Sequence, residues 1–123
     1  MPNIKNNIIP LSEWLTFELA DNKLVDPPII KLKLRPITDT DLMDAVVDNK
    51  IRPSEIMIMR ATDAIQEWDL SEDGKPIPCM EEKKRELALF LKLLLTSYLK
   101  SGDDFLAIAI IRYAQTLENF LKN

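Results

Sequence analysis

Oxygen-bearing side chains cluster in the segment 69–74, which reads Asp-Leu-Ser-Glu-Asp-Gly, and calcium binding is the chemistry that this spacing suggests. An EF-hand loop also places oxygen ligands at positions 1, 3 and 5 and glycine at position 6. The match then fails, because position 8 is Pro76 and position 12, which requires a bidentate glutamate, is Met80. We therefore interpret the segment as a tight turn at Asp73-Gly74 with solvated carboxylates, and we predict no metal site.

Other catalytic chemistries lack the residues that they need. Histidine is absent from the whole chain, which removes the commonest general base and every Ser-His or Cys-His dyad. Cys79 is the single cysteine, so no intrachain disulfide can form, and the isolated Gly74 and Gly102 cannot build a phosphate-binding loop. A pair of carboxylates could still act on glycosides, since only their separation in space would reveal it. We predict a protein that is not an enzyme and uses no cofactor.

The composition is that of one acidic globular domain over residues 1–123, with 1–10 as a loose arm. Hydrophobic residues make up 46% and charged residues 29% of the chain, and the net charge is −4. The basic group 83–85 is flanked by glutamates, so we expect a solvated helix face and no nucleic-acid partner. The run 105–111 is far shorter than the ~20 residues of a membrane span, and the start of the chain does not resemble a signal peptide. We expect a cytoplasmic protein.

Two segments with alternating apolar and polar side chains predict a β-hairpin over residues 14–36. The first segment is 14–20, for which a helix capped by Ser12 is the alternative. In the second, 30–35, aliphatic side chains alternate with cations until Pro36, which cannot donate to a strand ladder. A polar turn would connect the two strands.

The rest of the chain has helical patterns, so we predict an α+β fold that is predominantly helical, with the hairpin followed by four helices. Two helices are expected within 38–67, and a protruding turn over 68–79 follows them. Residues 80–121 are expected to form an αα-hairpin that ends the chain, with Gly102 as the stop signal of its first helix.

The run 105–111 is apolar on every side of its predicted helix, which is more apolar surface than one helix face can bury. We therefore expect part of its cover to come from another chain, either a partner protein or a second copy in a homo-oligomer. The apolar face of strand 30–35 is a second candidate surface, and Trp14 is either a core residue or an exposed anchor. The candidate partner-binding residues are Trp14, Ile30, Leu32, Leu34, Phe105, Ile108 and Ile111.

Two segments carry distinctive motifs. The first, 31–38, reads Lys-Leu-Lys-Leu-Arg-Pro-Ile-Thr; the second, 65–78, reads Ile-Gln-Glu-Trp-Asp-Leu-Ser-Glu-Asp-Gly-Lys-Pro-Ile-Pro, before a Glu-Glu-Lys-Lys helix start. In this order they resemble small tail-module proteins of long-tailed bacteriophages and prophages, in particular the tail assembly chaperone group. The resemblance covers residues 30–90, and the extensions on either side of it leave the subfamily open.

This resemblance implies a non-enzymatic factor that binds the tail tube or tape-measure protein before polymerisation, in the cytoplasm of the host bacterium. Such a factor needs an apolar surface that shields its partner and a charged remainder that keeps the complex soluble. The alternative is a phage- or host-encoded regulatory protein whose acidic surface binds a basic partner protein.

Overall fold

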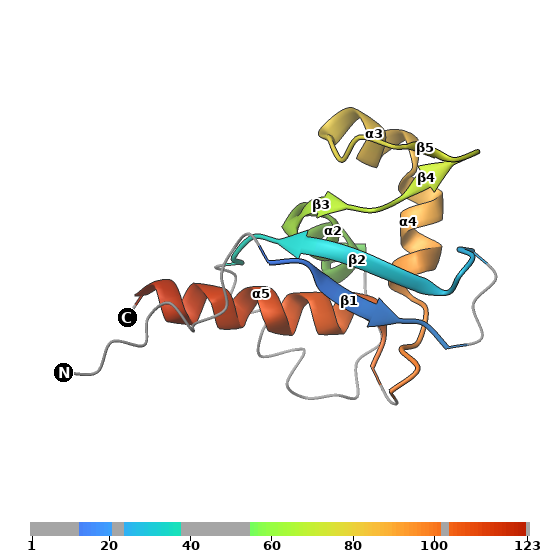
Figure 1. Ribbon diagram of the computed structural model, residues 1–123. Coiled ribbons are helices and arrows are strands. Elements are labelled where there is room, and N and C mark those ends of the chain that lie inside the picture. The colour runs from blue at the N-terminus through green and yellow to red at the C-terminus, as the bar shows by residue number, and fades with distance from the viewer. Residues whose placement is uncertain (1–12, 21–23, 38–54, 102–103, 123) are drawn as a thin grey trace.

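The computed structural model describes residues 13–20, 24–37, 55–101 and 104–122, with the backbone alone for 118–122. Within these ranges the chain combines antiparallel strands with helices, which confirms the predicted α+β class (Figure 1). The predicted arm over 1–10 and the first of the helices predicted within 38–67 lie outside the described residues. In the described part of the chain, no helix is long and apolar enough to cross a membrane.

A three-stranded antiparallel sheet forms the centre of the described structure, in the order β1-β2-β3. The strands are β1 (Leu15–Glu18), β2 (Ile29–Leu34) and β3 (Ile65–Trp68). The pairing of β1 with β2 sets Phe17 opposite Ile30, as expected for the predicted hairpin. Along β2, the buried residues Ile30, Leu32 and Leu34 alternate with the more exposed Ile29, Lys31 and Lys33, so the buried face of the strand is apolar.

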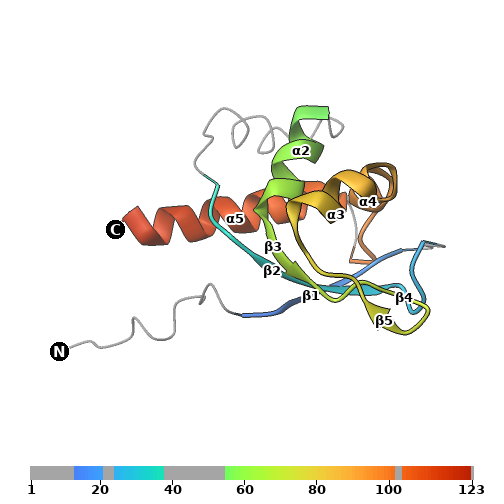
Figure 2. The ribbon, with the colours of Figure 1, turned by 90° about the horizontal axis from the view of Figure 1, so that it is seen from above.

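Four helices accompany this sheet in the described part of the chain. They are α2 (Glu55–Ala64), α3 (Glu81–Glu86), α4 (Ala88–Leu95) and α5 (Leu106–Lys122). Of these, α2 and α5 pack directly against the sheet. Seen from above, α2 and α5 lie on the same side of the sheet, and α4 lies near the start of β2 (Figure 2). Helix α2 packs against α5, and α4 contacts both of them.

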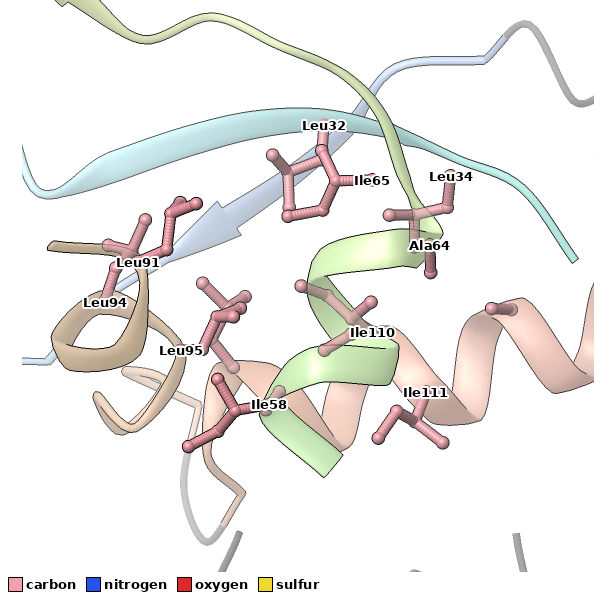
Figure 3. Close-up of a cluster of buried hydrophobic side chains, with 14 of the residues drawn as sticks. Leu32, Leu34, Ile58, Ala64, Ile65, Leu91, Leu94, Leu95, Ile110 and Ile111 are labelled. Atoms are coloured by element: carbon pink, nitrogen blue, oxygen red, sulfur yellow. The ribbon is translucent and has the colours of Figure 1, made fainter. Parts of the chain in front are cut away.

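The core lies between the sheet and these helices. Figure 3 shows its side chains converging from β2, β3, α2, α4 and α5; those labelled are Leu32, Leu34, Ile58, Ala64, Ile65, Leu91, Leu94, Leu95, Ile110 and Ile111. All of them are buried. The hydrophobic effect therefore ties residues far apart in the sequence into one cluster.

The prediction of a helix through residue 67 is wrong, because the helix ends at Ala64 and the chain continues directly as β3. The backbone N–H of Arg35 donates to the carbonyl of Ala64 at 2.8 Å, and this bond joins the end of the helix to the end of β2. Both Ile65 and Trp68 are buried in the strand. Pairing with β2 gives the backbone groups of this segment their hydrogen-bond partners. This tertiary interaction overrides the helical spacing of the apolar residues in the sequence.

The predicted αα-hairpin is also different in the structure. Its first helix is divided at Leu87, whose φ of −98° and ψ of 18° depart from helical values. In Figure 1, α4 stands upright while α5 lies horizontally, so the two helices cross instead of running side by side. Between them, Tyr98 pairs with Phe105, and their ring centroids are 4.3 Å apart.

A tight turn at Asp73 and Gly74 is confirmed. It joins two short strands, β4 (Ser71–Glu72) and β5 (Lys75–Pro76). Both turn residues have positive φ, 52° and 78°, as a two-residue hairpin turn with the sequence Asp-Gly requires.

Adjacent leucines on α4 allow a matched test of this core. We expect Leu94→Ala to lower the free energy of unfolding by about 2–5 kcal/mol, because it leaves a cavity among buried side chains. Leu93→Ala makes the same change one residue earlier, on the exposed side of the helix, and is expected to cost under about 1 kcal/mol. Urea denaturation measures both, and equal losses would contradict this packing.

Candidate protein-binding surface

The residues predicted to bind a partner do not form one surface in the structure. Ile30, Leu32 and Leu34 are buried under the helices, and Ile108 and Ile111 are buried on α5. Phe105 is half-buried against Tyr98. The reason is that α2 and the sheet cover the apolar run of α5, while α5 in turn covers β2. These aliphatic side chains belong to the core, and a partner could reach them only if the fold opened.

Trp14 precedes β1, with 42% of its surface exposed. Lys33 of β2 holds its Nζ 4.9 Å from the centre of the indole ring, a cation–π geometry. The same Nζ is 3.0 Å from a carboxylate oxygen of Glu67 on β3. Trp14 is therefore an exposed aromatic residue with a cationic neighbour, separate from the buried residues of the predicted set.

The exposed apolar side chains of α4 form a surface that the prediction missed. Its sequence is Ala-Leu-Phe-Leu-Lys-Leu-Leu-Leu, and three of its leucines point into the core. Leu89 and Leu93 are left 71% and 48% exposed. They are four residues apart and so lie one turn apart on the same side of the helix. We call this pair the α4 ridge.

A groove runs along one side of this ridge, between α2 and α4, with a volume of about 370 Å³. Leu89 and Met59 both line it, and Met59 is 52% exposed. At the rim, Lys92 of α4 forms an ion pair with Glu55 of α2, which links the two helices across the groove. Such an exposed ion pair contributes under about 1 kcal/mol. The α2–α4 groove therefore offers a methionine and a leucine beside charged groups.

Lys84 lines the same groove but points inward, and only 6% of its surface is exposed. Its Nζ donates a hydrogen bond of 2.7 Å to the backbone carbonyl of Ile65 in β3. Burial lowers the pKa of Lys84, and the positive charge of Arg35 lowers it further. The amine replaces the strand N–H that this carbonyl would otherwise need, so Lys84 has a structural role.

Cys79 lies close to the same carbonyl, with its Sγ 3.9 Å from the oxygen of Ile65. Burial raises the pKa of the Cys79 thiol, and it outweighs the opposite effect of the nearby Lys84. A thiol with a raised pKa is a poor nucleophile, because the thiolate is the reactive form. The geometry thus gives Cys79 the character of a packed side chain.

In the described ranges, no group of three His, Cys, Asp or Glu side chains is placed so that it could hold a metal ion. Comparison of the chain with protein-family models, with curated proteins and with solved structures finds no match. The function is therefore inferred from the α4 ridge and the α2–α4 groove.

The buried lysine predicts a specific dependence of stability on pH. Because the pKa of Lys84 in the folded state is below its ordinary value of 10.5, the unfolded chain binds more protons between those two pKa values. The contribution of Lys84 to the free energy of unfolding should then rise with pH across that window. We expect Lys84→Met to lack this rise when both proteins are unfolded with urea at a series of alkaline pH values.

Lys75→Met removes the same charge from an exposed position on β5 and serves as the matched control. Parallel curves of stability against pH for the unmodified protein and Lys84→Met would contradict the effect of burial on this lysine.

Proposed function

We propose that this chain is a protein-binding factor that contacts its partner through the α4 ridge and the α2–α4 groove. The observation that carries the proposal is the exposure of Leu89 and Leu93 on one side of a short helix, next to Met59. Adjoining exposed apolar side chains rimmed by charged groups are typical of protein–protein contact surfaces. Methionine adapts its shape easily and is common where a surface accommodates another protein.

We further propose that the partner is a phage tail protein, either the tail tube or the tape measure. The support for this is the resemblance of residues 31–38 and 65–78 to the tail assembly chaperone group. The two motif segments are neighbours in the fold, because β2 pairs with β3. A factor of this kind needs no catalysis: it covers an apolar face of its partner before assembly. The net charge of −4 would help to keep the complex soluble.

A variant that places charge on the ridge tests the proposal. We expect the double substitution Leu89→Glu and Leu93→Glu to leave the fold intact, because both side chains are exposed and glutamate favours helices. Binding should weaken by about 30-fold if the ridge is a hot spot of the interface, since substitution at a hot spot costs about 2 kcal/mol or more. The measurement is co-purification, and then calorimetric titration, with a tail tube polypeptide and with a tape-measure polypeptide from the same genome.

Gln66→Glu on β3 is a control for added negative charge, because it introduces one glutamate at an exposed position outside α4. It should bind as the unmodified protein does. Retained binding by the ridge variant would move the contact surface elsewhere. Absence of any complex with either tail polypeptide would exclude the tail function, and size-exclusion chromatography with light scattering would then show whether the ridge pairs two copies of this chain.

A further inference from the structure

A larger cavity, of about 630 Å³, lies where the loop before β2, the β4–β5 hairpin and α4 come together. These three elements are at the same end of the sheet in Figure 1. The cavity is lined mainly by apolar side chains, namely Leu24, Val25, Leu70, Ile77, Leu87 and Phe90. We call it the hairpin pocket. Its volume and lining are in the range of sites that receive a ligand or a protruding side chain.

Hydrogen bonds fix the wall of the hairpin pocket. The indole N–H of Trp68 donates to the carbonyl of Ile77 at 2.6 Å. The backbone N–H of Ile77 in turn donates to the carbonyl of Leu70 at 2.9 Å. Because Leu70 and Trp68 are themselves buried, this wall is anchored to the core. A binding partner would therefore meet a site that is already formed, which reduces the entropy lost on binding.

The rim of the hairpin pocket is acidic. Among the described residues that line it, Asp26, Asp69 and Glu72 carry negative charge and Lys31 carries positive charge, and all four are exposed. One carboxylate oxygen of Asp69 accepts the backbone N–H of Lys31 at 3.0 Å, so this carboxylate has a defined position. The rim carboxylates are not among any group placed to hold one metal ion in the described part of the chain. They are better matched by several positive charges spread along a polymer.

We propose that the hairpin pocket binds a segment of a partner polypeptide in which a bulky apolar side chain is flanked by lysine or arginine. The apolar side chain would lie on Phe90 and Ile77, and the flanking cations would lie near Glu72 and the other rim carboxylates. An anionic ligand would be repelled by the same rim. The inference does not depend on the tail function, because it concerns another flank of α4 and can be tested without the natural partner.

The test uses three synthetic peptides and the full-length protein labelled with nitrogen-15. The first peptide is acetyl-Lys-Lys-Phe-Leu-Lys-Lys-amide; the second replaces its lysines by glutamate, and the third replaces Phe-Leu by Ser-Ser. We expect the first peptide alone to shift the amide signals of Leu70, Ile77 and Phe90 in a saturable way. Its affinity should fall as salt is raised, since rim charges are screened within about 10 Å at 0.1 M salt.

Two rim substitutions separate the pocket from a general effect of charge. We expect Glu72→Lys to weaken binding of the first peptide about five- to tenfold, because an attraction at the rim becomes a repulsion. Glu82→Lys makes the same change of charge on α3, outside the residues that line the pocket, and should alter binding less than about twofold. Phe90→Ala should weaken binding further, with circular dichroism as the check that the protein remains folded.

The outcomes are distinct. Equal weakening by Glu72→Lys and Glu82→Lys would overturn the proposal, because binding would then follow net charge alone. Equal binding of the Ser-Ser peptide would also overturn it, since the apolar lining would have no part. Signal shifts confined to Met59 and Leu89 would assign the peptide to the α2–α4 groove instead. None of these results bears on whether the ridge variant binds a tail polypeptide, so the two proposals fail separately.

Discussion

The central strand β2 is the element on which the rest of the fold depends, because it is paired on both sides and buried on one face. Ile30, Leu32 and Leu34 stand on that face, and α2, α4 and α5 pack around the core to which they belong. Backbone bonds to β1 and β3 hold these side chains at fixed spacing. The apolar face of the sheet is small, so each helix can bury only part of its own surface against it. The positions of the helices follow from this close packing.

The limited room in the core explains why some leucines of α4 are exposed. A helix that crosses its neighbours can bury one side only, and α4 buries Leu91, Leu94 and Leu95. Since all but one of its residues are apolar, other apolar side chains must face outward. Phe90 then lines the hairpin pocket on one flank and Leu89 lines the α2–α4 groove on the other. The two proposed binding surfaces thus arise from a single short helix with too little polar character.

The sequence predicted the parts that depend on local pattern. Alternation in 30–35 identifies β2, and Asp73-Gly74 identifies the turn, because each signal lies within a few neighbouring residues. Strand β3 was missed, since its backbone partner is more than thirty residues away on β2. The crossing of α4 and α5 was missed for the same reason, because it depends on tertiary packing.

The sequence predicted that a helix would expose apolar side chains, but it placed them on the wrong helix. The run 105–111 is apolar on all sides of its helix, and α2 and the sheet provide the cover that such a helix needs. The run 87–95 is apolar in the same way apart from Lys92, and this pattern indicates the exposed leucines of α4. The hairpin pocket has no comparable signal, because its lining comes from residues 24–31, 69–77 and 87–90, which meet only in the folded chain.

The bond between Lys84 and the carbonyl of Ile65 has a consequence for how this protein behaves at high concentration. That carbonyl faces the outer edge of β3, where a strand from another molecule could otherwise add to the sheet. The buried amine of Lys84 already takes this acceptor, so an incoming strand would not find the carbonyl of Ile65 free. Pairing at this point of the edge would therefore require the hydrogen bond of Lys84 to break first.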